Sequence, residues 1–296
     1  METKRLCSWV LILGITLGPS FLGSEARAVG TNTDRIKDAI QLGIEENSAA
    51  YIFTQSKTSD QLAIDYLEKE RQRNTTLDQV WDRAVKGMGD KPLPDGLRRE
   101  HLLAVYAYTD SERNQFYREF NNAVRMYGTS DSVYAGNFPF KSVHYLLSVA
   151  LDRLREIAGS APGTTYRGMV EQVLPPKNNK MRFGYFASSS LNTSIAMKYA
   201  GKTLFEIKSQ FGVAIYNHSR IPEEMEVLIP PFEVFNVTNV STGNGRVTVS
   251  LEGVGSEGIP VKVERGKGGE MRVVRSSGVT FSPRLCILAL LVHIFA

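Results

Sequence analysis

Thr164-Thr-Tyr-Arg-Gly-Met-Val170, directly after Gly163, marks the point where the character of the sequence changes. This segment is short and rich in β-branched and aromatic residues, which is typical of a β-strand. Two strand-like segments that follow it, 246–251 and 260–264, alternate apolar and polar residues with a period of two, as half-buried strands do. The C-terminal half is therefore predicted to consist of strands. The later segments are 182–188, 203–207, 226–230, 246–251 and 260–264.

The sequence before Gly163 has the periodicity of helices instead, from residue 35 to about residue 159. Residues 60–73 place apolar side chains at mixed spacings of three and four beside charged positions, which is the pattern of an amphipathic helix. Residues 76–88 repeat this pattern and begin with Thr76, a residue type that caps helices well. Helices followed by strands predict an α+β fold rather than a doubly wound parallel sheet. Further helices are expected at 95–108, 111–126 and 140–158.

The composition is that of an ordinary globular protein. Of the 296 residues, 42% are hydrophobic and 22% are charged, which excludes a disordered, collagenous or coiled-coil chain. No apolar run approaches the length of about 18 residues that a conventional membrane-spanning helix needs. The formal net charge is only +4 and lies partly in the two ends, so the balance of charge does not predict binding to nucleic acid.

The sequence lacks the spacings of metal-binding and disulfide motifs. Its two cysteines, Cys7 and Cys286, lie at opposite ends of the chain, so neither a cysteine-based metal site nor a disulfide framework is predicted. The four histidines form no His-x-x-x-His or similar ligand spacing. We therefore expect a chemistry that needs no metal.

The first 28 residues are typical of a secretory signal peptide. Lys4 and Arg5 form a basic start, residues 6–22 are almost wholly apolar, and Ala26-Arg-Ala28 is a suitable cleavage site. The alternative is a short buried helix at the start of a domain. Cleavage after Ala28 would leave a mature chain that begins at residue 29.

The C-terminal end has the pattern of a signal for a glycosylphosphatidylinositol (GPI) anchor. Ser276-Ser-Gly278, three small residues, precede a short spacer and an apolar tail over 285–296 that is too short to span a bilayer. The alternative is a C-terminal strand or helix docked in the core. We expect residues 277–296 to be removed, which leaves 29–276 as a single domain on the outer cell surface, or secreted if the signal is not processed. A glycosylated chain would use some of its sequons at Asn74, Asn192, Asn217, Asn236 and Asn239.

Gly253-Val-Gly-Ser-Glu-Gly258 matches the G-x-G-x-x-G fingerprint of dinucleotide-binding domains letter for letter. That fingerprint requires a strand before it and a helix after it, because the N-terminus of the helix binds the pyrophosphate. Here the strand-like segment 260–264 follows. We therefore interpret the motif as the turn of a hairpin between two strands.

Three segments of the C-terminal half carry polar residues that chemistry could use. Thr165-Tyr-Arg-Gly168 sets an arginine in an otherwise apolar strand, where a surface ion pair is the alternative. Phe183 to Ser190 is an aromatic strand that ends in three hydroxyl groups, which could instead cap the following helix. In Pro222-Glu-Glu-Met-Glu226, the residues Glu224 and Glu226 are two positions apart. In an extended chain their carboxylates would therefore point to the same side and converge on one substrate. A solvated loop is the alternative there.

Taken together, these segments resemble the R-S-E class of mono-ADP-ribosyltransferases, in particular the arginine-specific vertebrate ecto-enzymes. The resemblance rests on Tyr166-Arg-Gly168, on residues 182–190 and on residues 224–233, in the family's order of Arg, then Ser-x-Ser, then Glu-x-Glu. The helical segments 116–124 and 138–147 are also similar to segments of that family. The likeness thus extends over most of the mature domain.

The resemblance implies a fold, an activity and a location. The fold would be a helical N-terminal half packed on a mainly antiparallel, split β-sheet core of the ADP-ribosyltransferase type. The activity would be transfer of ADP-ribose from NAD, or NADP, to arginine side chains of extracellular or cell-surface proteins, with release of nicotinamide. NAD would be a co-substrate, and no prosthetic group or metal would be needed. Members are often secreted or GPI-anchored, in agreement with the two terminal signals.

The resemblance also implies roles for single residues. Glu226 would stabilise the positive charge on the ribose as nicotinamide leaves, and Ser188 would hold Glu226 and that ribose in register. Arg167 would bind the diphosphate with its fork of donors. Glu224 would orient the acceptor arginine. Further expected contacts to NAD come from Gly168, Tyr185 and Ser219, and the rings of Phe183, Tyr185 and Phe186 could stack on nicotinamide.

This chain departs from the family pattern in three places. No cysteine remains in the mature domain, where members usually carry disulfides, and Pro222 and Met225 stand where the family often has Gly and Glu. The middle position of Glu-x-Glu is variable, so we expect activity to be kept. Two alternatives stay open. Loss of Glu224 would favour an NAD glycohydrolase on the same scaffold, and loss of Arg167, Ser188 or Glu226 would favour a catalytically silent cell-surface binding module.

Overall fold

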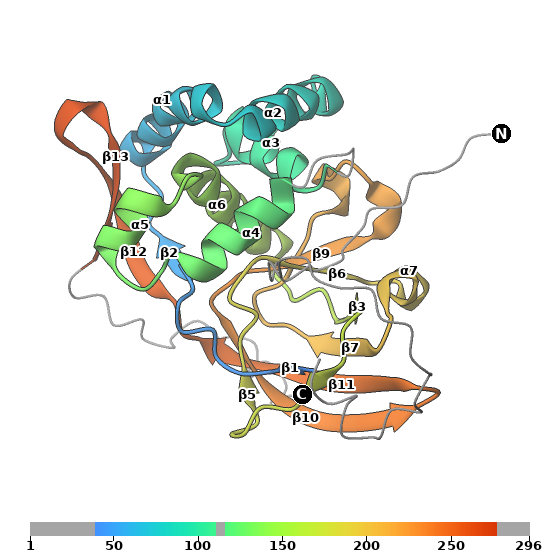
Figure 1. Ribbon diagram of the computed structural model, residues 1–296. Coiled ribbons are helices and arrows are strands. Elements are labelled where there is room, and N and C mark those ends of the chain that lie inside the picture. The colour runs from blue at the N-terminus through green and yellow to red at the C-terminus, as the bar shows by residue number, and fades with distance from the viewer. Residues whose placement is uncertain (1–38, 111–115, 277–296) are drawn as a thin grey trace, which may run out of the picture.

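The computed structural model describes residues 39–110 and 116–276 (Figure 1). The predicted signal peptide and the predicted anchor signal over 277–296 lie outside these residues, so the structure tests neither of them. Among the helices that it describes, none has the length and the apolar character needed to cross a membrane.

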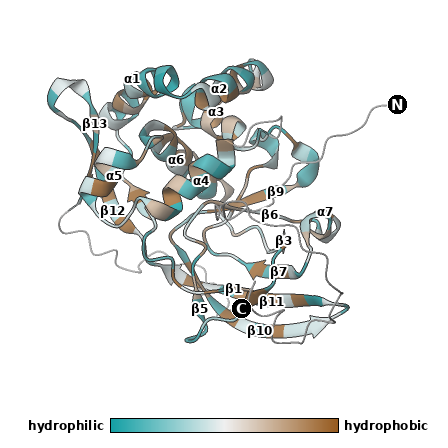
Figure 2. Ribbon diagram, viewed as in Figure 1, coloured by the Kyte–Doolittle hydropathy of each residue, from teal (hydrophilic) through white to brown (hydrophobic). Residues whose placement is uncertain are grey.

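The helical half lies between residues 57 and 158 and forms the upper layer in Figure 1. Apolar side chains such as Leu77, Val80 and Trp81 of α2 face inward and form a buried core with many aromatic rings. In Figure 2 the outer surfaces of α1 and α2 are mostly hydrophilic. The helices of this layer are α1 (Lys57–Arg73), α2 (Thr75–Met88), α3 (Arg99–Tyr108), α4 (Phe116–Met126), α5 (Asp131–Asn137) and α6 (Lys141–Ala158).

Two expectations for this half are wrong in detail. The predicted cap Thr76 lies inside α2, because the side chain of Asn74 caps the helix by accepting the backbone N–H of Leu77 at 2.8 Å. The region before α1, expected to be helical, forms the short strands β1 (Ile40–Gln41) and β2 (Tyr51–Phe53). Each of them pairs in parallel with a strand from the C-terminal half. Because β1 and β2 are held by segments far away in the sequence, their own residues carry no periodic pattern that would predict a strand.

The C-terminal half is built around an eight-stranded sheet, the lower layer in Figure 1. All neighbouring strands in it are antiparallel except β7 and β11, which are parallel. The predicted α+β fold with a mainly antiparallel sheet is therefore confirmed. In spatial order the strands are β5 (Lys180–Met181), β10 (Glu233–Gly243), β11 (Arg246–Ser256), β7 (Thr203–Lys208), β3 (Thr164–Met169), β6 (Ala187–Ser190), β9 (Glu226–Ile229) and β8 (Val213–Ala214). The helix α7 (Thr193–Tyr199) follows β6.

Two smaller sheets connect the halves. β12 (Ile259–Arg265) lies between β13 (Met271–Arg275) and β2, and β4 (Val173–Leu174) pairs with β1. β11 and β12 thus belong to different sheets, so the hairpin predicted across the glycine motif 253–258 is wrong. The motif does lead from one strand into another strand rather than into a helix, as the sequence predicted.

The aromatic segment 182–188, expected to be one strand, is a strand only from Ala187 onward. Side chains bond the backbone of Gly184 and Phe186, whereas the N–H of Arg182 donates to the backbone carbonyl of Gly43. Asn121 of α4 bonds both the N–H and the carbonyl of Phe186, at 3.2 and 3.1 Å. Arg182 donates to two backbone carbonyls of distant segments. These residues therefore form an irregular connection that is anchored to the helical half.

β9 lies between two buried cores. Leu228 packs in the core of the helical half, whereas Ile229 packs in the separate core of the sheet. Because side chains alternate along a strand, Glu226 points to the same side as Leu228, toward the helices. Figure 2 shows β9 as a hydrophobic strand between the two layers. The carboxyl group at the start of β9 therefore lies at the boundary between the two cores.

Candidate active site

The register of β6 and β9 brings predicted site residues together. In this antiparallel pair Ser190 lies opposite Glu226, and Ser188 lies opposite Leu228. Directly opposed and alternate residues share a face of a sheet, so Ser188, Ser190 and Glu226 point to the same side. β3, which carries Arg167, pairs with β6 through Tyr166 and Ser190.

Glu226 has a shifted acidity. Its side chain is buried, with the residue 4% exposed, and burial raises the pKa of its carboxyl group to about 8. A hydrogen bond with Ser188 and the positive charge of Arg167 lower this pKa, and the negative charge of Glu224 raises it. The carboxyl group is thus close to its ionisation point at neutral pH, which is common for groups that act in catalysis.

Arg167 lies in the interior and does not form the surface ion pair considered as an alternative. It is 4% exposed, and β3 is flanked by β7 and β6. Its Nη1 donates to the backbone carbonyl of Ser188 at 2.6 Å, and its Nη2 donates to the hydroxyl of Tyr185 at 3.4 Å. The guanidinium group is therefore fixed beside the strand whose serine bonds Glu226.

Glu224 is buried as well, with 7% of the residue exposed, so the solvated-loop alternative is wrong. The hydroxyl of Tyr199 in α7 donates to its Oε1 at 2.8 Å, and burial raises the pKa of its carboxyl group. The predicted extended geometry is also wrong, because Glu224 ends a 3-10 turn and Met225 adopts a left-handed conformation. The two carboxyl groups nevertheless lie close enough for the charge of Glu224 to raise the pKa of Glu226.

The serines of β6 do not cap α7, contrary to one alternative. The cap is Asn192, whose side chain accepts the backbone N–H of Ser194 at 2.9 Å. Ser190 donates instead to the backbone carbonyl of Glu224 at 2.6 Å. The β6 hydroxyls thus hold the glutamate segment, Ser188 through the carboxyl of Glu226 and Ser190 through the backbone.

The remaining expected NAD contacts have clear structural partners, and their contact with NAD stays a prediction. A Cβ atom on Gly168 would lie 2.3 Å from the carbonyl oxygen of Ala196 in α7, so close packing explains this glycine. The ring of Tyr185 is covered by the guanidinium of Arg125, with 4.3 Å between the Cζ atom and the ring centroid. Ser219 is buried and accepts the backbone N–H of Ile221 at 3.2 Å.

The other two rings of the aromatic segment are core residues. Phe183 packs in the core of the sheet, and Phe186 packs in the core of the helical half. Both side chains are almost fully buried. Their packing accounts for them without a stacked nicotinamide.

Three residues near the site were not predicted. Tyr108 of α3 donates to the carbonyl of Phe186 at 2.6 Å and accepts from Asn121 at 2.9 Å, and Ser188 lies close enough to lower its pKa, which burial raises. Tyr199 binds Glu224, as described above. Asn121 lies in the segment 116–124, which is similar to a segment of the family. That similarity was a signal by which Asn121 could have been predicted. Tyr108 lies among apolar residues of α3, and Tyr199 ends the short helix α7 after Lys198. Nothing in the sequence around either tyrosine marks it as part of a site.

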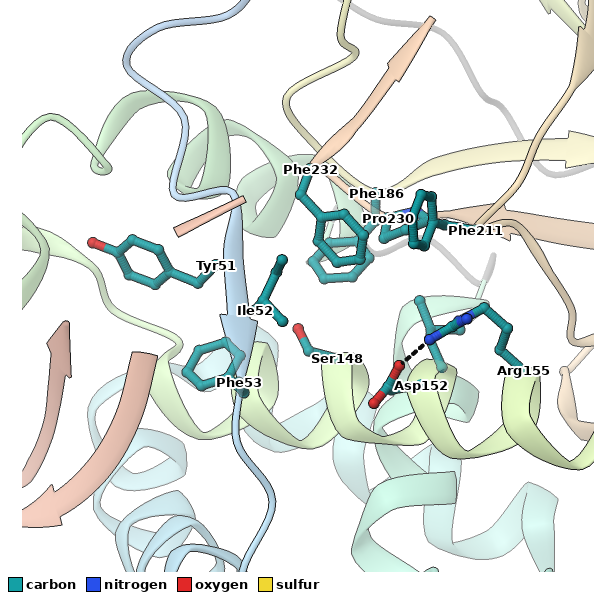
Figure 3. A pocket seen from close by; sticks show the side chains of 11 residues that line it. Tyr51, Ile52, Phe53, Ser148, Asp152, Arg155, Phe186, Phe211, Pro230 and Phe232 are labelled. Atoms are coloured by element: carbon teal, nitrogen blue, oxygen red, sulfur yellow. Dashed lines mark hydrogen bonds and ion pairs between the residues drawn. The ribbon is translucent and has the colours of Figure 1, made fainter. Parts of the chain in front are cut away.

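A cavity in the described structure lies apart from this site. Figure 3 shows it beside β2, with the rings of Phe211 and Phe232 near Pro230, and with the ion-paired Asp152 and Arg155 on α6. Arg167, Ser188 and the two site glutamates do not line it. Over residues 39–110 and 116–276, no three His, Cys, Asp or Glu side chains gather into a group that could hold a metal ion. Burial, charge and hydrogen bonding define the candidate site.

Comparison with known families decides where the chain belongs. The family model described as NAD:arginine ADP-ribosyltransferase matches residues 48–257, which contain β3, β6 and β9. This chain belongs to the NAD:arginine ADP-ribosyltransferase family. The resemblance seen in the sequence is thereby confirmed.

Individual relatives of this chain include curated proteins and solved structures. Ecto-ADP-ribosyltransferase 5 of Bos taurus is 38% identical over 205 residues, which cover 66% of this chain and 65% of the relative. GPI-linked NAD(P)(+)--arginine ADP-ribosyltransferase 1 of Mus musculus is 41% identical over 152 residues, 51% of this chain and 46% of the relative. The chain thus spans less than two thirds of either protein. The crystal structure of the eukaryotic mono-ADP-ribosyltransferase ART2.2 superposes with a TM-score of 0.61 at 28% identity, over 74% of this chain and 97% of that one.

Proposed function

We propose that this member of the family transfers ADP-ribose from NAD to arginine side chains of proteins and releases nicotinamide. The observation that carries the proposal is the buried carboxyl group of Glu226, on the same sheet face as Ser188, whose backbone carbonyl binds Arg167, and under the influence of the charges of Arg167 and Glu224. A mutant of ART2.2, at 28% identity and a TM-score of 0.59, has been solved in complex with NAD. That complex supports NAD as the donor.

In the donor half of the reaction, the bond between the nicotinamide nitrogen and C1′ of the ribose breaks. Its electron pair leaves with nicotinamide, which becomes neutral, and positive charge develops on the ribose. The ionised carboxylate of Glu226 stabilises that charge. Ser188 keeps the carboxylate in place through their hydrogen bond.

Arg167 binds the diphosphate of NAD in this proposal. A guanidinium group offers a planar fork of donors that suits phosphate oxygens, and the bond to the Ser188 carbonyl fixes its position. The hydroxyl of Tyr185 accepts from the same guanidinium. We assign Gly168, Ser188 and Ser219 as further contacts to NAD.

In the acceptor half, Glu224 attracts the guanidinium of the target arginine. A new bond forms between a guanidinium nitrogen and C1′ of the ribose, and the nitrogen loses one proton. Burial raises the pKa of Glu224, which makes this carboxylate a better proton acceptor than one in water. Tyr199 holds the carboxylate through the bond to Oε1.

The two alternatives from the sequence gain no support. An NAD glycohydrolase needs only water as the acceptor, so it gives no reason for a second buried carboxyl group at Glu224. A silent binding module gives no reason for the contacts among Arg167, Ser188 and Glu226.

The proposal is tested with NAD labelled in its ADP-ribose part and agmatine, a small guanidinium compound, as the acceptor. We expect labelled ADP-ribosyl-agmatine to form faster than free ADP-ribose, which is measured in parallel. Free ADP-ribose alone would identify a glycohydrolase. Turnover of neither kind would contradict an enzymatic function.

We further propose that residues 1–28 are a signal peptide, that 29–276 form one catalytic domain, and that 277–296 are replaced by a GPI anchor. The family match over 48–257 falls inside the proposed domain, and one relative is itself named as GPI-linked. Phosphatidylinositol-specific phospholipase C is expected to release the protein from expressing cells. An intact residue 296 in the mature protein, found by mass spectrometry, would contradict the anchor.

A further inference from the structure

The second half of β10 is a free edge of the large sheet. On one side β5 pairs only with Phe235 and Asn236, whereas on the other side β11 pairs with β10 as far as Gly243. Within residues 39–110 and 116–276, no strand lies beside residues 238–243 on the side away from β11. These six residues are all exposed, and Figure 1 shows β10 at the bottom of the molecule, away from the helices. Their unpaired backbone groups could pair with the same edge of a second copy of the chain.

This free edge lacks most of the protection that edge strands usually have. Natural proteins protect such edges with charged side chains, with proline, with bulges or with a covering segment. Residues 238–243 are Thr-Asn-Val-Ser-Thr-Gly, which include no charged residue and no proline. A bulge between Val237 and Asn239 interrupts the register once, but the residues after it pair regularly with β11. Val240 adds an apolar side chain that is 40% exposed. The edge therefore needs another form of cover.

A sequon, Asn239-Val-Ser241, lies on this edge. Asn239 is exposed and lies opposite Ser250 of β11, and the next pair along the two strands is Val240 and Val249. Val249 packs in the core of the sheet. Because side chains alternate between the two faces of a sheet, Asn239 points to the face opposite this core. The structure thus leaves room for a large group on its side chain.

The other four sequons lie in different settings. The side chains of Asn74 and Asn192 cap α2 and α7, where each accepts a backbone N–H. Asn236 is half-buried and has a strand on each side, β5 and β11. Asn217 is exposed, but it lies on a 3-10 turn and not on a strand. Of the five sequons, Asn239 alone combines an exposed side chain with a free strand edge.

We propose that Asn239 carries an N-linked glycan that covers the free edge of β10 and keeps it from pairing with a second copy. In this modification the amide nitrogen of Asn239 loses one proton and bonds C1 of a sugar, and the lipid diphosphate that carried the sugar leaves. An N-linked glycan is bulky and solubilising, so two such edges could not approach to the strand spacing of about 4.8 Å. The inference rests on the proposed signal peptide, because the modification occurs in the secretory pathway, and not on the transferase activity.

The first measurement locates the glycan on the full chain expressed in vertebrate cells. Peptide N-glycosidase F, used in water enriched in heavy oxygen, converts a glycosylated asparagine into a labelled aspartate, which mass spectrometry identifies. We expect the label at Asn239. A protein recovered from the cell surface or the medium without the label at Asn239 overturns this inference and leaves the signal peptide standing. A chain that stays inside the cell without a label at any sequon contradicts both. Transfer to agmatine is a separate readout of the same protein.

The second measurement is self-association of the purified protein, followed by analytical ultracentrifugation. All variants carry Asn236→Gln, so that the neighbouring sequon cannot replace the lost one. Asn239→Gln and Ser241→Ala both remove the sequon, and the second change leaves the asparagine in place. Both should shift the sedimentation from monomer to dimer and larger species, at concentrations at which Asn236→Gln alone stays monomeric. Asn239→Lys also removes the glycan but sets a charge on the edge, so it should stay monomeric.

Asn217→Gln in the same background is the matched control, because it removes another exposed sequon away from the edge. It should stay monomeric. The covering role is overturned if Asn239→Gln and Ser241→Ala stay as monomeric as Asn236→Gln alone. It is equally overturned if Asn239→Lys associates as strongly as Asn239→Gln, or if Asn217→Gln associates to the same extent.

Discussion

Glu70 in the helical half and Glu226 in the sheet are both buried carboxyl groups whose pKa burial raises to about 8. Glu70 lies on α1 and accepts the backbone N–H of Ser142 in the first turn of α6, at 3.1 Å to Oε2. The positive charge of Lys141 lowers its pKa. A carboxyl group at a helix N-terminus satisfies backbone donors there, so Glu70 joins two helices.

Glu226 likewise has a serine and a cation beside it, but it also has a second acid. Its carboxyl group bonds a side chain, Ser188, and lies within the influence of a second acid, Glu224, and a cation, Arg167. Burial and a raised pKa alone therefore do not distinguish a site from a structural contact. The difference lies in the backbone N–H groups at a helix N-terminus that hold Glu70 and in the second acid, Glu224, that acts on Glu226.

The sharpest test of this comparison replaces each acid by its amide. Glu226→Gln removes the charge that stabilises the transition state and is expected to lower both transfer and NAD hydrolysis by about 10²–10³-fold. Glu70→Gln should keep near-wild-type turnover in the same assays. Turnover by Glu226→Gln above about a tenth of the wild-type value would remove the distinction between the two acids.

Both amides should also change the pH dependence of stability in the same direction. An acid whose folded-state pKa is raised from 4.5 to about 8 stabilises the fold fully below pH 4.5. That contribution is lost as the pH rises from 4.5 through about 8, because the unfolded chain releases a proton there that the folded protein still holds. The amides cannot ionise, so Glu70→Gln and Glu226→Gln should lose less stability than the wild type between these pH values in thermal melts. The two variants are therefore distinguished by their enzymatic turnover and not by the pH dependence of their stability.

The second test is at Glu224, the acid that accompanies Glu226 and has no counterpart beside Glu70 in the interactions described. Glu224→Gln should suppress transfer to agmatine about ten- to a hundredfold more than it suppresses NAD hydrolysis, since only a guanidinium acceptor needs its charge. Parallel rate measurements with one preparation check the ratio. An equal fall in both rates would place Glu224 in the donor half of the reaction.

The third test is the pH profile of kcat/KM for NAD, which reports ionisations of the free enzyme. Because Glu226 acts as a carboxylate and its pKa is raised to about 8, the rate should rise from pH 6 to pH 8 roughly fiftyfold. Glu70→Gln should give the same profile. A rate that is flat over this range would show that the reacting carboxylate is already ionised at pH 6.

The smallest effect is expected at the link between the two halves. Asn121→Ala removes the bonds to Tyr108 and to the backbone of Phe186, two residues before Ser188. We expect kcat to fall about tenfold, because the three lost hydrogen bonds act on Ser188 only indirectly, with a smaller change in KM for NAD. The neighbouring Asn122 is exposed, and Asn122→Ala serves as the control. Equal effects of the two variants would exclude a positioning role for Asn121.

The sequence was informative where local pattern and chemistry coincide. The change from helical to strand periodicity at Gly163 predicted the α+β fold, and the polar residues of the later segments led to Arg167, Ser188 and Glu226. The predictions that failed depend on distant partners. β2 exists because β12 lies beside it, and β11 ends in a different sheet from β12. Tyr108 escaped notice for the same reason, since its hydroxyl meets Ser188 only after α3 packs against the sheet.

The close packing at Gly168 affects how mutation could change the activity during evolution. Any larger residue there must push α7 away from β3, because even a methyl group would lie 2.3 Å from the Ala196 carbonyl. Tyr199, on the same helix, would then move away from the carboxyl group of Glu224. A one-base exchange from glycine to alanine could thus weaken the choice of acceptor while sparing Glu226. Under the proposed function, the balance between transfer to arginine and hydrolysis of NAD could therefore change while both acids stay in place.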